Sequence, residues 1–273
     1  MVENTGISWG DCSIDLSFPK PRLSSVLLID QNIQDFQSVL LRMVANELES
    51  SRPVHWIDGG MSFDPSPLLP LLRMRNCDTL NPLRSFHISR GFTAHQTVSI
   101  VKRLADEAKL SPPPDRIING RLIIISEVSR MFMDSQLKKP EGRSLLTETL
   151  ERCRALSKDS ESLVIITSSR NSSPPLSKDM RHILRRFSDD TLRISNLLSK
   201  NRDRSFVRKK LHLLSIDKEV IWANLPVGQT SLLEFRHNQE SRLDCLIEPL
   251  ARSSSLQPNG ESIAVAARIA NRV

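Results

Sequence analysis

The sequence predicts an α/β fold with a mostly parallel central sheet. Two observations lead to this prediction. Short runs rich in β-branched and other apolar residues recur along the chain, and stretches of helical periodicity separate them. Neighbouring parallel strands need long crossover connections, which the helical stretches provide. The strands predicted in this way cover residues 26–29, 54–57, 85–89, 122–125, 163–167 and 192–195, and a terminal β-hairpin is predicted over residues 206–214 and 219–223.

Four crossover helices are predicted, at residues 38–50, 67–75, 93–109 and 143–157. The third shows the pattern most clearly, because apolar residues recur at three- and four-residue spacing and charged residues occupy the opposite side. Its apolar positions are Val98, Val101, Leu104, Ala105 and Ala108. Three consecutive prolines at 112–114 end this helix, since proline lacks a backbone donor and pushes the preceding residue into an extended conformation.

The composition is that of an ordinary globular protein. The 273 residues are 39% hydrophobic and 25% charged, enough for one large domain or one domain with an extension. The longest apolar runs are strand-sized and the start of the chain is not basic-then-apolar, so we expect neither a membrane span nor a secretory signal. The widely spaced cysteines predict reduced thiols in an intracellular protein, not a disulfide framework or a zinc site. They are Cys12, Cys77, Cys153 and Cys245.

The positive charge is concentrated in one segment. The formal net charge is +7, and residues 178–210 alone carry eleven Lys/Arg against four Asp. This segment therefore accounts for the whole excess, and the rest of the chain is balanced. A concentrated basic segment is typical of a surface that contacts a phosphate backbone. The alternative is a solvated helix face together with a strand edge protected by cations.

The first predicted strand leads into a loop and a helix, which is the arrangement of a phosphate-binding loop. That motif requires glycines, a lysine and a Ser/Thr at the spacing G-x-x-x-x-G-K-[ST]. Here the two glycine positions hold Asp30 and Asp35, the lysine position holds Phe36, and the hydroxyl position holds Gln37. Two carboxylates would repel a triphosphate, so this loop predicts no nucleotide binding of the usual kind.

Five later segments follow one another in a particular order along the chain. They are VHWIDGGMSFDP at 54–65, NPLRSFHISRGFTAHQ at 81–96, the strand at 121–125, LVIITSS at 163–169, and the basic stretch at 188–214. In this order they resemble the ATPase core of the RecA/RadA recombinase superfamily, over roughly residues 20–215. The resemblance implies a RecA-like three-layer αβα fold with a C-terminal β-hairpin, and a core at residues 21–225 with extensions at 1–20 and 226–273.

The departures from that family imply that catalysis has been lost. Ser126 stands where the resemblance expects the magnesium-binding aspartate, and Gly60 where it expects the glutamate that activates water. We therefore expect a pseudo-ATPase that is not an enzyme and has no cofactor or metal. Glu127 offers an alternative magnesium ligand, although a metal without a phosphate cradle has little to coordinate. No nucleophile elbow or activated cysteine is present to predict a hydrolase.

The predicted nucleic-acid contacts lie in two loops and in the basic segment. Residues 133–143 and 168–175 correspond to the two loops that touch DNA in recombinases, although ordinary solvated loop charges are an equal alternative. The chain has no tyrosine, so base stacking is poorly supplied and base-specific recognition is not predicted. The predicted contact residues are Lys138, Lys139, Arg143, Arg170, Arg185, Arg186, Arg202, Arg204, Arg208, Lys209 and Lys210.

The resemblance and the basic segment together predict an accessory factor in homologous recombination and DNA repair. It would bind single- or double-stranded DNA, dock to a recombinase or a sister paralog, and form an oligomer in the cytoplasm or nucleus. The alternative is a structural subunit of an assembly built from RecA-like pseudo-ATPase folds, as in Elongator, with RNA as a further ligand. A degenerate signalling ATPase of the KaiC-like branch is the third hypothesis.

Overall fold

The computed structural model describes residues 6–30, 33–61, 63–75, 80–110, 122–169, 176–197 and 208–223. The chain divides into two compact units, Met1–Gln229 and Thr230–Val273, and the second lies outside the described residues. The fold below is therefore that of the first unit. Most of the predicted C-terminal extension, residues 226–273, belongs to the second.

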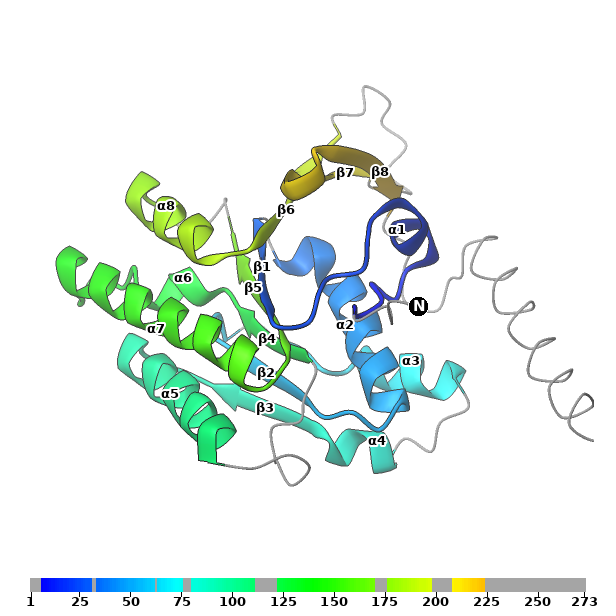
Figure 1. The fold of residues 1–273 in the computed structure, drawn as a ribbon, viewed down its shortest axis with the longest axis horizontal. Helices are drawn as coiled ribbons and strands as arrows, with labels where there is room; N and C mark the ends of the chain where they lie inside the picture. The colour runs from blue at the N-terminus through cyan, green and yellow to red at the C-terminus, as the bar shows by residue number, and fades with distance from the viewer. Residues whose placement is uncertain are drawn as a thin grey trace, which may run out of the picture. The chain divides into compact units, whose positions relative to one another are not determined.

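The described residues form one eight-stranded sheet with the order β3-β2-β4-β5-β1-β6-β7-β8 (Figure 1). All pairings from β3 to β6 are parallel, whereas β6–β7 and β7–β8 are antiparallel. The prediction of an α/β fold with a mostly parallel sheet is therefore confirmed. The strands are β1 Ser25–Asp30, β2 Val54–Asp58, β3 Phe86–Arg90, β4 Leu122–Ser126, β5 Leu163–Ser168, β6 Asp190–Asn196, β7 Arg208–Leu213 and β8 Lys218–Ala223.

Helices cover both faces of the sheet, an arrangement compatible with a three-layer αβα fold (Figure 1). Buried residues of α1 to α3 form a first core with one face, and those of α5 to α8 form a second core with the other. The helices are α1 Cys12–Ser17, α2 Ile33–Glu49, α3 Leu68–Met74, α4 Leu80–Arg84, α5 Ala94–Leu110, α6 Val128–Met131, α7 Lys139–Asp159 and α8 Lys178–Phe187, with a 3-10 turn η1 at Leu214–Ile216.

The central strands are apolar throughout because both of their faces are covered. In β4, Ile124 packs into the first core and Ile123 into the second, since successive side chains of a strand point to opposite faces. Every residue of β2, β4 and β5 is buried. This is the pattern expected of parallel strands enclosed by crossover helices.

The N-terminal segment packs against the last strand of the sheet. Trp9, Phe36 and Trp222 form an aromatic cluster, with ring centroids 6.4 Å apart for Trp9–Phe36 and 5.7 Å apart for Phe36–Trp222. Beside it, the buried Asp11 pairs with Arg42 of α2 at 2.9 Å and accepts a hydrogen bond from Trp222 Nε1 at 3.0 Å. Residues near the start of the chain therefore join α2 to β8.

The antiparallel part of the sheet contributes to only one of the two cores. Leu211 and Leu213 of β7 face the first core, whereas no described residue of β6, β7 or β8 belongs to the second. We call the opposite side of these strands the open sheet face; it carries Arg193, Ser195, Arg208, Lys210, His212 and Ile221. Ile221 is 66% exposed, which shows that this face is accessible.

Within the part of the chain that the structure describes, no helix has the length and apolar character needed to cross a membrane.

Candidate nucleic-acid interface

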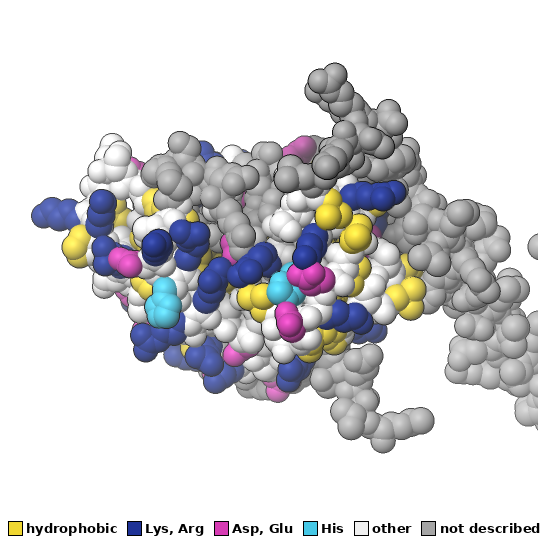
Figure 2. Space-filling view, turned by 90° about the horizontal axis from the view of Figure 1, so that it is seen from above, with side chains coloured by type: hydrophobic (Ala, Val, Ile, Leu, Met, Phe, Trp, Pro, Cys, Tyr) yellow, Lys and Arg dark blue, Asp and Glu magenta, His cyan; other side chains and the backbone are white. Residues whose placement is uncertain are grey.

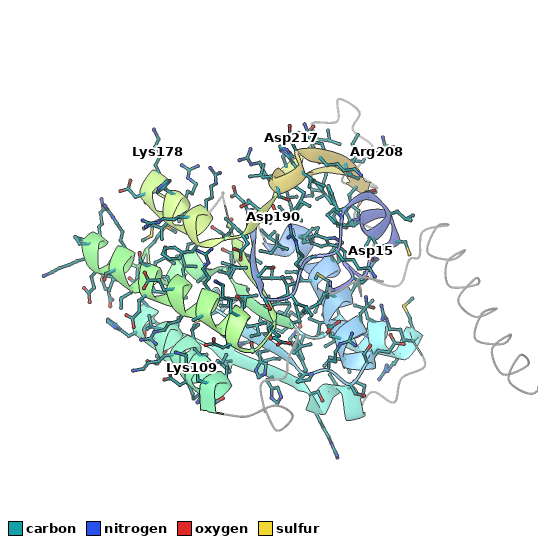
Figure 3. The ribbon with its side chains drawn as sticks, viewed as in Figure 1. Asp15, Lys109, Lys178, Asp190, Arg208 and Asp217 are labelled. Carbon is teal, nitrogen blue, oxygen red and sulfur yellow. The ribbon has the colours of Figure 1, made fainter. Side chains whose placement is uncertain are left out.

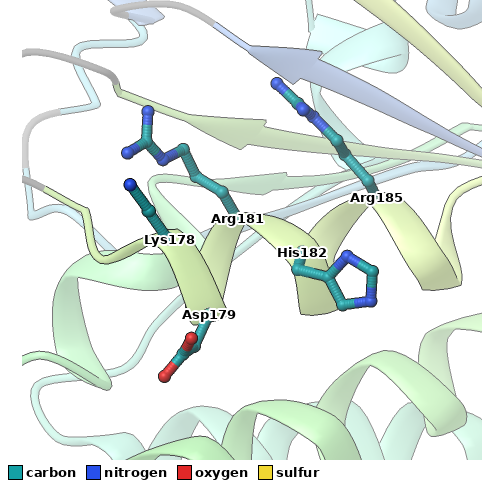
Figure 4. A pocket seen from close by; sticks show the side chains of 5 residues that line it. All are labelled: Lys178, Asp179, Arg181, His182 and Arg185. Carbon is teal, nitrogen blue, oxygen red and sulfur yellow. The ribbon is translucent and has the colours of Figure 1, made fainter.

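Helix α8 places three cationic side chains on one side. Ser177 begins the helix by accepting a hydrogen bond from Met180 N, and Met180 and Leu184 anchor it in the second core. Because a helix repeats every 3.6 residues, Lys178, Arg181 and Arg185 then lie along one other side. Figure 4 shows these three side chains extending together, away from Asp179 and His182.

A cavity of about 520 Å³ adjoins these side chains, and it is lined by Lys178, Asp179, Arg181, His182 and Arg185 (Figure 4). The carboxylate of Asp179 pairs with Arg143 of α7 at 3.0 Å, so its charge is already balanced by a residue outside the lining. The cavity therefore has a positive lining that suits an anion.

Arg185 also reaches the carboxyl end of β1. Its Nη2 atom lies 3.3 Å from Oδ2 of the buried Asp30, while 44% of the Arg185 side chain remains exposed. In open α/β sheets, ligands bind outside the carboxyl ends of the strands. The cationic side of α8 thus lies next to the edge of the sheet where ligand binding is expected.

The cations continue from α8 onto the open sheet face. Figure 2 shows Lys and Arg side chains gathered across this side of the molecule, with a small acidic group among them. Arg208 is exposed, and Lys210 pairs with Glu219 at 2.5 Å. His212 lies 2.8 Å from the exposed carboxylate of Asp217. Figure 3 places Lys178, Asp217 and Arg208 along the upper side of the molecule in that view.

The structure separates the predicted contact residues into three groups. Arg185, Arg186, Arg208 and Lys210 lie on α8 and the open sheet face, and Arg186 is exposed with its guanidinium 5.9 Å from the centroid of the Phe187 ring. Lys138, Lys139 and Arg143 lie at the start of α7, all three exposed. Arg170, Arg202 and Arg204 lie outside the described residues.

Lys209 requires a correction to the predicted surface. Its side chain points to the first core, opposite Trp222 on β8, and only 3% of the residue is exposed. Its ammonium donates a hydrogen bond to Asn196 Oδ1 at 2.7 Å. Alternation along β7 places Lys209 on the same face as Leu211 and Leu213, so it is turned away from the exposed cations on either side of it.

Two cations of α8 were absent from the predicted contacts, although the sequence contains a signal for them. Lys178 and Arg181 precede Arg185 at helical spacing, and apolar residues recur at Met180, Ile183, Leu184 and Phe187. This amphipathic pattern predicts a helix with a cationic side.

The position of a phosphate-binding lysine is filled by a core residue. Phe36 is completely buried in the aromatic cluster, and Gln37 next to it donates from Nε2 to Asp64 O at 3.3 Å. The loop residues 31 and 32 lie outside the described residues.

The residues at the other two catalytic positions take part in a buried polar network. Ser126 Oγ accepts a hydrogen bond from Trp56 Nε1 at 3.1 Å and lies 3.3 Å from Asp58 Oδ1. Asp58 in turn accepts from the backbone N–H of Gly60 and of Phe63. These contacts connect β2, β4 and the loop after β2, which is a structural role.

Glu127, the alternative magnesium ligand, is buried and has a left-handed backbone with φ of 52°. Its backbone N–H donates to Thr167 Oγ1 at 2.9 Å. Among the described residues there is no group of three His, Cys, Asp or Glu side chains arranged to hold a metal ion. Burial raises the pKa of the Cys153 thiol to about 12, which makes it a poor nucleophile.

No protein-family model matches this chain, and no curated protein matches it. The candidate interface therefore rests on the geometry and charge described above.

Proposed function

We propose that the protein is a non-catalytic paralog of the RecA/RadA superfamily, an accessory factor in homologous recombination and DNA repair that binds nucleic acid through α8 and the open sheet face. The observation that carries the binding proposal is the row of Lys178, Arg181 and Arg185 beside the carboxyl end of β1. Such a row neutralises successive phosphates without reading bases.

The non-catalytic part of the proposal is supported by the side chains at the expected catalytic positions. A fully buried phenylalanine cannot approach a phosphate as a lysine does, and Ser126 lacks the charge needed to order a magnesium ion. The mostly parallel sheet with helices on both faces is compatible with the family's fold. Binding, rather than hydrolysis, is the activity that these residues favour.

Fluorescence anisotropy with labelled oligonucleotides tests the binding proposal. We expect the triple variant Lys178→Gln/Arg181→Gln/Arg185→Gln to bind about tenfold or more weakly at low salt, with a shallower salt dependence. The matched control is Lys102→Gln/Arg103→Gln/Lys109→Gln on α5, which removes the same charge from exposed positions. Figure 3 shows Lys109 well away from Lys178 and Arg208.

An equal loss of affinity in both triple variants would show that the effect depends only on net charge. Undetectable binding by the unmodified protein at low salt would contradict the proposal.

Docking to a recombinase or sister paralog is tested separately, by co-purification from native extract followed by light scattering of the isolated protein. Recovery of such a chain together with the protein supports the recombination role.

A further inference from the structure

The carboxyl end of β1 brings two arginines to one carboxylate. Arg193 of β6 is the register partner of Asp30, and Arg185 of α8 donates to Asp30 Oδ2 at 3.3 Å. Register partners on parallel strands face the same side of the sheet, about 4.8 Å apart. Two cationic residues therefore adjoin Asp30, Arg185 through its guanidinium and Arg193 as a neighbour on the next strand.

Arg193 has a buried hydrogen-bond donor that no described residue accepts from. Its Nε atom is buried, and it has no hydrogen-bond partner among the described residues. A buried donor without an acceptor costs free energy, so such a group calls for an explanation, and a bound water or ion is one of them. The missing partner at this position is an acceptor, ideally an anionic one.

Arg185 is positioned to contribute to the same ligand. A guanidinium carries five donors, so the hydrogen bond to Asp30 leaves most of them available on its exposed part. Asp30 thereby acts as a positioning residue that holds Arg185 at the end of β1. Arg185, but not Arg193, lines the cavity of about 520 Å³ beside α8, which has room for a phosphate with the groups attached to it.

We propose that Arg185 and Arg193 together hold one phosphate group of the nucleic-acid backbone, with Arg193 Nε as a donor for which the described residues provide no acceptor. Planar guanidinium groups match the oxygens of a phosphate in pairs, which a single lysine cannot reproduce. This inference rests on the proposed function, and it adds Arg193, a residue outside the predicted contacts.

The test compares Arg193→Gln, Arg185→Gln and the double variant in the full chain, by anisotropy with a labelled oligonucleotide over a range of salt concentrations. Each single variant is expected to lose on the order of tenfold in affinity and about 0.7–0.9 in the slope of log K against log salt, the value for one phosphate contact. Because both arginines hold the same phosphate, the double variant loses much less than the product of the two single effects. The control is Arg152→Gln, which also removes a paired, partly exposed arginine.

Two further measurements sharpen the result. Arg193→Lys keeps the positive charge that Arg193→Gln removes, but it lacks the planar guanidinium group. We therefore expect it to bind the oligonucleotide more weakly than the unmodified protein. Inorganic phosphate is expected to displace the oligonucleotide more effectively than chloride at equal ionic strength, and this difference disappears in Arg193→Gln. Thermal melting confirms that each variant is folded.

Several outcomes would overturn the shared phosphate contact. The shared contact is contradicted if Arg193→Gln leaves the affinity unchanged, or if the losses of the two single variants multiply in the double variant. The proposed binding function still stands in that case, provided that the α8 triple variant loses affinity. Phosphate bound by the protein alone, with no effect of Arg193→Gln on the oligonucleotide, would indicate a site for free phosphate and not for the backbone. Absence of any oligonucleotide binding would remove the proposed function together with this inference.

Discussion

At the scale of single residues, Phe36 has the most direct influence on what this chain can do. It occupies the position at which a phosphate-binding loop carries its lysine, and it is completely buried between Trp9 and Trp222. A charged side chain at this point would lose its hydration without gaining a partner. The aromatic ring therefore stabilises the fold at a position where a lysine would serve nucleotide binding.

Removing that ring is expected to destabilise the protein strongly. Phe36→Ala deletes a large side chain from a packed core and should lower the free energy of unfolding by about 3–5 kcal/mol. Urea denaturation measures the change. Phe92→Ala is the control, since Phe92 is 60% exposed and its removal should change stability by less than about 0.5 kcal/mol. A loss of under 1 kcal/mol in Phe36→Ala would show that the cluster is loosely packed.

His55 makes stability depend on pH. Burial, together with the charge of the neighbouring His87, lowers the pKa of His55 from 6.5 to about 4. The unfolded chain therefore binds a proton more readily than the folded chain between these two values, and the free energy of unfolding falls as the pH drops from 6.5 to 4. The full loss is about 3 kcal/mol.

Urea denaturation at a series of pH values tests this dependence. His55→Asn is expected to flatten the profile between pH 6.5 and 4, because it removes the titrating group. His95→Asn is the control for replacing a histidine at an exposed position, since the His95 side chain is 64% exposed. The attribution to His55 fails if its replacement leaves the same slope in that window.

At the scale of elements, Gly142 sets how closely the first turn of α7 approaches the preceding segment. A Cβ atom added there would lie 2.4 Å from the backbone oxygen of Phe132, and backbone cannot move aside as a side chain can. Arg143 and the predicted loop cations Lys138 and Lys139 flank this contact. The close approach therefore fixes the position of these cations relative to the sheet.

Gly142→Ala is accordingly expected to lower the free energy of unfolding by about 1–3 kcal/mol, as overpacking does. The neighbouring Ser144→Ala is the control, because Ser144 is exposed and alanine favours a helix. Thermal melting of both variants gives the comparison. An equally small change in the two proteins would mean that α7 can shift without cost.

The same scale shows how far the sequence predicts the structure. Apolar runs predict the six parallel strands, and the structure confirms all six within about two residues at each end. The four predicted crossover helices are confirmed as α2, α3, α5 and α7. Helix α8 was missed, although the apolar residues Met180, Ile183, Leu184 and Phe187 recur at helical spacing within the charged segment.

The candidate site is less predictable, because it depends on pairing between distant segments. Charge alone identifies the basic segment, but it does not distinguish the buried Lys209 from the exposed Arg208. That distinction depends on the strand register, which turns every side chain to the other face when it shifts by one residue. The meeting of Asp30, Arg185 and Arg193 requires the order of the strands, with β6 next to β1.

At the scale of the whole molecule, contacts between distant parts of the chain hold the first core together. Asp11 caps α1 and pairs with Arg42 of α2, and it also accepts a hydrogen bond from Trp222 of β8. A buried ion pair of this kind contributes little compared with apolar packing, but breaking it leaves a buried charge without a partner.

Removing Asp11 alone should therefore destabilise the protein more than removing Asp11 and Arg42 together. We expect Asp11→Ala to lower the free energy of unfolding by about 3–5 kcal/mol, and Asp11→Ala/Arg42→Met to be less destabilised than the sum of the two single variants. Denaturant unfolding provides the double-mutant cycle. Glu151→Ala, at an exposed carboxylate of α7, should show little change. Strict additivity in the cycle would show that Asp11 and Arg42 do not depend on each other.

The placement of Trp222 has a consequence for biosynthesis. Trp9 and Phe36 leave the ribosome long before β8 has been translated, so a growing chain exposes two large aromatic surfaces whose third neighbour does not yet exist. Nascent polypeptides with uncovered apolar surface are prone to aggregate. A ribosome stalled before codon 222 should consequently hold a chain that chaperones engage and proteases cleave, whereas one stalled well beyond it should hold a protected domain.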